Sequence, residues 1–169
     1  MELKDVLLKR RSIRKFKKDK IDPTLIDELL HAGMSGPSAC NRRPWEFYVI
    51  TNEDKLDEIH SIMRFARYKA PLGIIVCGNL KRALPLQLST YWIQDCSAAS
   101  ENILLRATDL GLGAVWCGIH PQKLMEKKIR AALDLKESEI PLGLLLIGYP
   151  DEEIEARDQY DVKRVHRIN

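Results

Sequence analysis

The sequence predicts a single domain of the α+β class. Short apolar runs bounded by glycine and proline indicate buried strands, and longer stretches with apolar residues at helical spacing indicate helices. Both kinds of segment alternate along 169 residues, a length that normally forms one domain with its own core. Because no internal repeat, low-complexity segment or linker divides the chain, we expect residues 1–169 to form one unit.

The expected helices are marked by their apolar spacing and by their first residues. Asp22-Pro23 begins one helix with a capping side chain and a proline at the first helical position, and this helix should end near Gly36-Pro37. The longest helix should run from about Thr90 to Leu110. It is apolar on two sides, which suits a central helix that packs against a sheet and could also meet a partner chain. Shorter helices are expected over 2–9, from Thr51 or Asn52 through Met63, and over 122–133.

Four segments are expected to be strands. Leu72–Cys77 and Leu142–Ile147 are apolar throughout, as in strands that are buried on both faces. Trp45–Ile50 and Ala114–Cys117 complete the set. The sequence therefore predicts a sheet whose central strands are covered by helices on both sides.

Composition and cysteine spacing exclude several classes of protein. Lys and Arg outnumber Asp and Glu by only 27 to 24, too weak a balance to argue for a nucleic-acid partner. The four cysteines lack the spacing of a zinc site, so we expect neither a metal site nor a disulfide framework. The longest apolar run, 141–150, is far too short to span a membrane, and the first residues lack the apolar core of a signal peptide. We expect a cytoplasmic protein.

The first functional cluster is Arg10-Arg11-Ser12-Ile13-Arg14, with three guanidinium groups and one hydroxyl in five residues. Arginine binds phosphate oxygens in bidentate geometry, and a hydroxyl adds a further donor. Cations after a helix are favourable in any case, and a basic run is often only a solvated surface. The helix end does not explain Ser12 or Arg14, which lie beyond it. The glycines at 111 and 113 follow a helix and precede a strand, the reverse of a dinucleotide fingerprint, so we interpret them as a helix end and tight turn.

The second cluster is the segment Pro37–Trp45, which lies between a helix and a strand. A plain connector is one interpretation, because the prolines at 37 and 44 would stiffen its ends. The presence of Ser38, Asn41 and Trp45 in so stiff a loop favours a binding role, since these groups could contact a flat polar ring. Together the two clusters predict a site for a phosphorylated heteroaromatic cofactor.

In their order and spacing these motifs resemble the FMN-dependent nitroreductase family in its short form. The resemblance covers the whole chain: the Arg-Arg-Ser-x-Arg opening, the Pro-Ser-x-x-Asn-x-x-Pro-Trp loop, the long helix, Leu110–Gly113, Ile147-Gly148 and Val165-His166. It implies a three-layer α/β/α sandwich with a central mixed, mostly antiparallel sheet, and an intertwined homodimer whose subunits both contribute to each FMN site. It also implies that residues of about 151–169 form a C-terminal arm exchanged with the partner subunit. From composition alone, a disordered tail is an equal alternative.

The resemblance also implies a role for individual residues. Arg14 would reach the pyrimidine side of the flavin, where a cation stabilises the charge of the reduced ring. A backbone N–H at Cys117 or Gly118 would face the reactive nitrogen, and the 37–41 segment would come from the other subunit. Arg164 resembles a second phosphate-binding arginine. The expected cofactor-binding residues are Arg10, Arg11, Ser12, Arg14, Pro37, Ser38, Ala39, Asn41, Trp116, Cys117, Gly118 and Arg164.

The implied function is that of an FMN-dependent NAD(P)H oxidoreductase. NADH or NADPH would be the transient hydride donor, and a nitroaromatic, a quinone or a similar small molecule the acceptor. The first step requires no side-chain acid or base, so no catalytic residue is expected. The cysteine spacing given above predicts no metal. An FMN-binding module that stores or senses the cofactor with little turnover is the alternative. The family also includes dehalogenases and flavin-cleaving enzymes, but those usually carry a lid insertion where this chain has only the short segment 79–89.

Several residues near the expected site remain open. Arg43 stands where the family often has glutamine, so the loop is more basic than is usual in the family. Cys40 and Cys117 should lie near the flavin and are interpreted as small packing residues rather than redox groups. His120 and His166 have no neighbour in the sequence that suggests catalysis.

Overall fold

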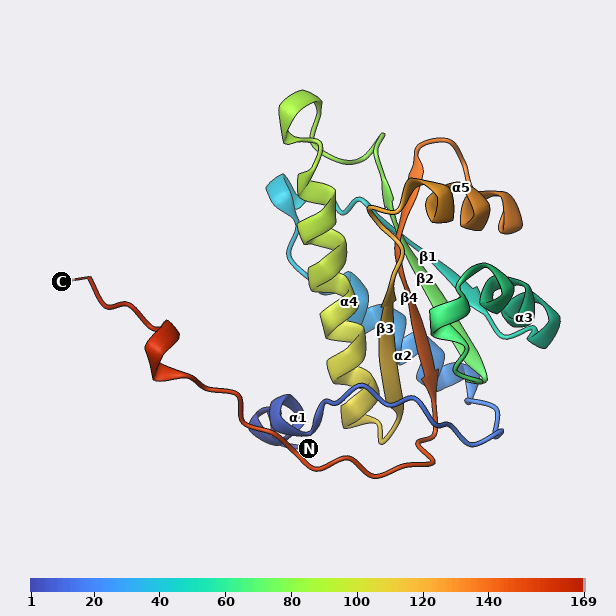
Figure 1. Ribbon diagram of the computed structural model, residues 1–169. Coiled ribbons are helices and arrows are strands. Elements are labelled where there is room, and N and C mark those ends of the chain that lie inside the picture. The colour runs from blue at the N-terminus through green and yellow to red at the C-terminus, as the bar shows by residue number, and fades with distance from the viewer. Residues whose placement is uncertain (169) are drawn as a thin grey trace.

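The computed structural model describes residues 1–168 and places one sheet between two layers of helices (Figure 1). The predicted helices and strands are present, with small shifts of their ends. In chain order the elements are α1 (Leu3–Lys9), α2 (Pro23–Met34), η1 (Ala39–Asn41), β1 (Trp45–Ile50), α3 (Glu53–Ile62), η2 (Arg64–Ala66), β2 (Leu72–Asn79), η3 (Leu86–Leu88), α4 (Tyr91–Asp109), β3 (Gly113–Gly118), α5 (Lys123–Ala132), β4 (Glu139–Gly148) and η4 (Val162–Arg164), where η marks a short 3-10 helix.

The four strands lie in the order β1-β2-β4-β3, and every neighbouring pair is antiparallel. The outer edge of β3 meets the N-terminal segment through a parallel bridge between Ser12 and Ala114. This bridge is what makes the sheet mixed, as predicted. It also brings the first functional cluster to the sheet edge.

The helix starts follow the side chains that the sequence offers. The Asp22 carboxylate accepts a hydrogen bond from the Thr24 N–H, 2.8 Å away, with Pro23 as the first helical residue of α2. Of the two candidate caps for α3, Asn52 is the one used, since its side chain accepts from the Lys55 N–H. At the end of α4, Gly111 has φ +75°, the left-handed conformation expected of a glycine that ends a helix.

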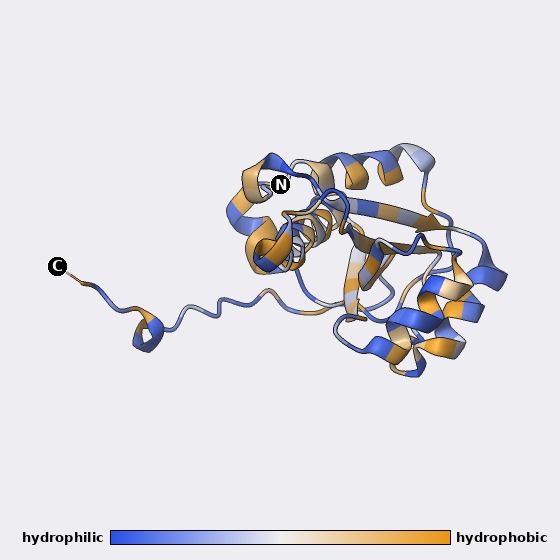
Figure 2. Cartoon of the chain, turned by 90° about the horizontal axis from the view of Figure 1, so that it is seen from above, coloured by the Kyte–Doolittle hydropathy of each residue, from blue (hydrophilic) through white to orange (hydrophobic). Residues whose placement is uncertain are grey.

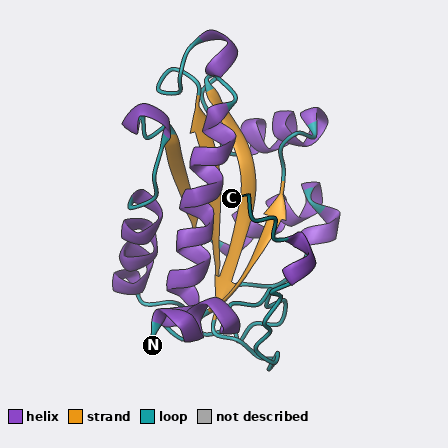
Figure 3. Cartoon of the chain, turned by 90° about the vertical axis from the view of Figure 1, so that its left-hand side faces the viewer, coloured by secondary structure: helices purple, strands orange, loops and turns teal. Residues whose placement is uncertain are grey.

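Side chains of the central strands point alternately to the two faces of the sheet, so the core has two parts. Ile74 and Leu145 face α2 and α4, whereas Ile75 and Leu144 face α3 and α5. Figure 2 shows the sheet between these helix layers, and Figure 3 shows α4 running along it. The predicted three-layer sandwich is therefore confirmed. The helix α4 supplies much of the first core, including the fully buried Ile103.

Two indole side chains lie against glycines of the sheet on the α4 side. A Cβ at Gly78 would come within 2.2 Å of the Trp92 ring, and a Cβ at Gly143 within 2.3 Å of Trp116 Nε1. Both positions need glycine because a side chain would take the place of the indole. These contacts hold the two tryptophans in place near the end of β3.

The C-terminal segment passes beneath α1 and then extends away from the body (Figures 1 and 3). The N–H of Arg157 donates to the carbonyl of Leu8 at 3.0 Å. Beyond that contact the apolar side chains of Tyr160 and Val162 are exposed. The segment thus has the shape of an arm. No helix in the described part of the chain is both long and apolar enough to cross a membrane.

Candidate functional site

The cluster Arg10–Arg14 runs along the free edge of β3. The N–H of Ile13 donates to the carbonyl of Ala114 at 3.0 Å. Beyond the cluster, the N–H of Lys17 donates to the carbonyl of Tyr149 at 2.9 Å, at the end of β4. These backbone bonds fix the segment to the edge of the sheet beside β3.

The three arginines of this cluster have different surroundings. Arg10 Nε lies 3.3 Å from Oε1 of Glu101 on α4, and the Arg11 guanidinium donates to the carbonyl of Glu155. Arg14 is exposed and lies over the ring of Tyr68, with Cζ 5.8 Å from the ring centroid. Within the described chain Arg14 forms no ion pair, so its charge remains available to a ligand.

The open edge of β3 offers backbone N–H groups. Ala114 directs its carbonyl away from β4, toward Ile13, while the Ile119 N–H points the other way and donates to Leu142 at 2.9 Å. Because successive residues of a strand alternate in direction, Trp116 and Gly118 share the outward orientation of Ala114. Of the two donors expected from the sequence, Gly118 rather than Cys117 therefore faces the edge. Gly118 is exposed, and a Cβ added to it would find no atom within 4 Å.

The side chain of Cys117 points away from α4, into the core covered by α3 and α5. Burial raises the pKa of its thiol to about 11, and the nearby charge of Arg14 only partly opposes this shift. The thiol therefore stays protonated at neutral pH. This is the environment of a packing residue.

The second cluster is a tight loop held by its own side chains. Cys40, Asn41 and Arg43 have φ values of 49°, 54° and 48° in the left-handed region. The Ser38 hydroxyl accepts from the Arg43 N–H at 2.9 Å, and the Asn41 side-chain oxygen accepts from Arg43 Nε at 2.7 Å. The Ala39 N–H donates to the carboxylate of Asp95, 2.9 Å away on α4. Polar groups that the sequence assigns to a ligand thus also shape the loop.

Within one chain the two clusters lie on different sides of α4. The first contacts Glu101 and the second contacts Asp95. Six residues of helix separate these positions by about 9 Å along the axis and by about 120° around it. The structure places Arg10, Arg11, Ser12, Arg14, Trp116, Cys117 and Gly118 along one edge of the sheet, with the Cys117 side chain turned into the core. It places Pro37, Ser38, Ala39 and Asn41 apart from them, and it leaves Arg164 on the exposed arm, paired with Asp161 at 3.3 Å.

One pair of residues near the site was missed by the sequence analysis. His120 does have a partner: its Nδ1 lies 2.7 Å from Oε1 of the buried Glu126. Residues six apart are not neighbours on a helix face, and in a strand they share a face but lie about 20 Å apart. A turn and the start of α5 bring the two together, so no local pattern signals the contact.

Comparison with known proteins supports the family expected from the sequence. The model of the nitroreductase family matches residues 7–67 and 64–149. A candidate NADH dehydrogenase/NAD(P)H nitroreductase of Methanothermobacter thermautotrophicus is 39% identical over 168 residues, covering 98% of this chain and 86% of the relative.

Solved structures are similar along their full length. A candidate NADH dehydrogenase/NAD(P)H nitroreductase from Parabacteroides distasonis superimposes with a TM-score of 0.93 at 35% identity, covering 100% of this chain and 99% of the other. An FMN-dependent nitroreductase from Clostridium difficile R20291 has a TM-score of 0.88 at 31% identity, with 98% of each chain covered.

Proposed function

The chain belongs to the nitroreductase family, and on that premise we propose that it is an FMN-dependent oxidoreductase that transfers hydride from NADH or NADPH to a small-molecule acceptor such as a quinone or a nitroaromatic compound. The enzyme class and both cofactors are supported by the names of relatives, which include an NAD(P)H-dependent FMN reductase of Bacillus subtilis and the FMN-dependent nitroreductase described above. The acceptor class follows from the resemblance and from the family name.

The observation that carries this proposal is the line of groups along the edge of β3. Arg10, Arg11 and Ser12 supply donors for a phosphate, and Arg14 supplies a free cation farther along the same edge. Gly118 presents an N–H with open space on its side-chain face. A phosphorylated flavin needs these features in this order, so the residues present fit FMN.

The roles of the protein groups follow from their chemistry. Bound FMN would accept a hydride from the nicotinamide and pass it to the acceptor. Arg14 would stabilise the negative charge of the reduced state, and the outward N–H of Gly118 would fix the position of the ring edge. The arginines at 10 and 11 would bind the phosphate. Binding at this end would set how far along the edge of β3 the flavin ring lies.

We further propose that two copies of the chain form each site. The segment 37–41 lies on the other side of α4 from the arginine cluster, so a second copy is the simplest source of both segments at one flavin. The arm from about 151 onward extends from the body with apolar side chains exposed at Tyr160 and Val162 (Figure 1). Packing on a partner would bury them and carry Arg164 toward the partner's phosphate site.

The test is to purify the protein, measure flavin absorbance, and follow its bleaching by NADH and by NADPH without oxygen. We expect yellow protein whose flavin is bleached by at least one nicotinamide and restored by benzoquinone. Arg14→Ala should weaken FMN binding. Protein that is colourless and does not bind added FMN would refute the proposal, and yellow protein that no nicotinamide bleaches would instead favour the storage or sensing module.

A further inference from the structure

A histidine–carboxylate pair follows the end of β3, outside the expected cofactor-binding residues. His120 lies two residues beyond Gly118, and its Nδ1 is 2.7 Å from Oε1 of Glu126. The other carboxylate oxygen is 3.1 Å from Nζ of Lys123. The backbone N–H of His120 donates to the carbonyl of Leu142 at 3.0 Å. Both the main chain and one nitrogen of the imidazole are therefore fixed.

The second nitrogen of this imidazole is free. Nε2 of His120 has no hydrogen-bond partner within the described residues. Among the described residues, the buried side-chain polar atoms without a hydrogen-bond partner are Nε2 of His60 and Nε of Arg130. Nε2 of His120 is not one of them, so it is not sealed from solvent. The His120 side chain keeps 18% of its surface exposed. Solvent, or a ligand, can therefore reach Nε2.

The ring is held by an aromatic wall. His120 meets Trp92 edge to face, with ring centroids 5.0 Å apart and planes at 70°. Trp92 lies on Gly78 and belongs to the core on the α4 side of the sheet. Since Glu126 belongs to α5, the imidazole lies between α4 and α5, just beyond the end of β3.

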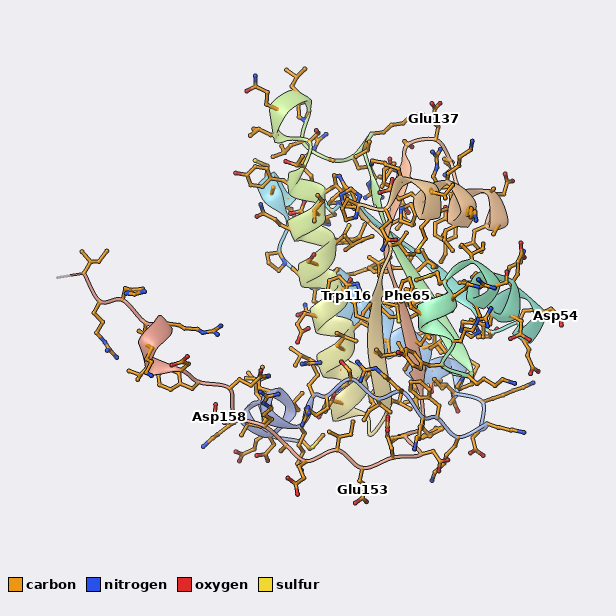
Figure 4. All side chains as sticks on the ribbon, in the orientation of Figure 1. Asp54, Phe65, Trp116, Glu137, Glu153 and Asp158 are labelled. Atoms are coloured by element: carbon orange, nitrogen blue, oxygen red, sulfur yellow. The ribbon has the colours of Figure 1, made fainter. Side chains whose placement is uncertain are left out.

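Trp116 lies on the same side of the sheet as Trp92, alongside α4 (Figure 4). Gly118 shares that side by strand alternation, and it leaves the side-chain position between Trp116 and His120 open. Along the end of β3 the Trp116 indole, the open position at Gly118 and the His120 imidazole thus follow one another. A molecule bound beside the Gly118 N–H would lie next to His120, whose Nε2 is open to solvent.

We propose that His120 donates a proton to the acceptor and that Glu126 positions it for this step. The inference rests on the proposed function, because the reduced cofactor must supply the hydride. A quinone gains an electron pair and a hydrogen from that hydride at one oxygen and a proton from Nε2 at the other. The products are the hydroquinone and a neutral imidazole, which regains a proton from water. The Glu126 carboxylate keeps the remaining proton on Nδ1, which leaves Nε2 as the working nitrogen.

The first experiment separates the two half-reactions in flavin-loaded protein. His120→Gln keeps a hydrogen-bond donor for Glu126 but has no acidic proton. We expect bleaching by the nicotinamide to stay within about twofold, and reoxidation by benzoquinone to slow by about 100-fold. Imidazole added to His120→Gly should restore part of the lost rate. His31→Gln, the same change at an exposed histidine of α2, should alter neither half-reaction.

The second experiment needs no flavin. The ¹⁵N spectrum of the His120 imidazole in its neutral form should show the proton on Nδ1. Glu126→Gln removes the charge that holds this proton and should raise the share of the Nε2–H form. A wild-type imidazole in the Nε2–H form would overturn the proposal.

The rates of the two half-reactions can also contradict the proposal. Equal slowing of both by His120→Gln would indicate a structural role, and unchanged reoxidation would show that the proton comes from elsewhere. If His120→Gln bleaches normally and is reoxidised normally, the proposed function stands and only this inference fails. If the wild-type flavin is never bleached, the proposed function fails, and the inference fails with it.

Discussion

The two functional clusters are held in place by different means. The segment Arg10–Arg14 is bound to the sheet through its backbone, with the Ile13 N–H on the Ala114 carbonyl. The loop Pro37–Arg43 has left-handed residues and is tied to α4 by the carboxylate of Asp95. The first cluster is thus an extension of the sheet, whereas the second depends on a few side-chain contacts. The two should therefore respond independently to mutation.

Thiol labelling offers the largest expected contrast between these regions. Cys40 is exposed in the loop, whereas Cys117 is buried on β3, and burial raises the pKa of its thiol to about 11. Because only the thiolate reacts, iodoacetamide at pH 8 should label Cys40 at least about 100-fold faster than Cys117. Peptide mass spectrometry of flavin-free protein would measure both rates.

The same labelling experiment sharpens the comparison when FMN is added. If the loop joins the flavin site, FMN should slow the labelling of Cys40. Cys40→Ser serves as the control and should leave no fast-reacting thiol. Comparable rates at Cys40 and Cys117 would contradict the contrast.

A methyl group at Gly113 should detach the first cluster without touching the second. A Cβ there would lie 2.7 Å from Cγ2 and 2.8 Å from Cβ of Ile13. Isoleucine is stiff at its first torsion, so the segment itself must shift. Gly113→Ala should lower the free energy of unfolding by about 1–3 kcal/mol in urea titrations and weaken FMN binding.

The matched control is Gly118→Ala at the other end of β3. A Cβ there meets no atom within 4 Å, so the free energy of unfolding of flavin-free protein should change by no more than about 0.5 kcal/mol. Equal destabilisation by the two substitutions would show that the contact with Ile13 is not the cause.

Removal of the Asp95 carboxylate should loosen the second cluster alone. Asp95→Ala leaves the Ala39 N–H without its partner, but water can replace the lost bond because the loop is half-exposed. We expect a loss of about 1 kcal/mol in urea titrations. Amide exchange at Ile13 should not change. Gln94→Ala, at the exposed neighbouring position, should cost less, and an equal loss there would argue against the anchor.

Much of the fold could be predicted because its signals are local. Apolar runs indicated β2 and β4, but the strands extend past those runs to Asn79 and Glu139, whose backbones pair although their side chains are polar. Apolarity reports burial, and it does not report where backbone pairing ends. The short 3-10 helices also escaped prediction, since they lack a hydrophobic period.

The candidate site was also predictable only in part, for the same reason. The arginine cluster was found because its residues are neighbours in the chain. The contacts Ala39–Asp95 and His120–Glu126 join residues that no periodic pattern relates, so they emerge only from the fold. The same holds for the choice of Gly118 over Cys117 as the outward donor, because the direction of an N–H depends on which neighbour β3 pairs with.

The smallest expected effect concerns the attachment of the first cluster to the C-terminal segment. Oε1 of Glu152 accepts from the N–H groups of Arg14 and Lys15 at 2.5 and 3.1 Å. The Arg14 N–H is the main cause that lowers the pKa of this carboxyl. A lowered pKa means that the contact is present above the ordinary glutamate range and is lost as the pH falls through the lowered value.

Hydrogen exchange can test this contact directly. Glu152→Ala should speed exchange of the Arg14 amide about three- to tenfold at pH 7, since an exposed hydrogen bond contributes little. Glu153→Ala is the matched control: this neighbouring exposed carboxyl, labelled in Figure 4, accepts no hydrogen bond from Arg14 or Lys15 within the described chain. At pH 7 the Arg14 amide should exchange more slowly in the wild-type protein than in Glu152→Ala. This difference should disappear at acid pH. Protection that persists in Glu152→Ala would show that the sheet edge alone holds the cluster, and would place the entire difference between the two clusters in the bond from Ile13 to Ala114.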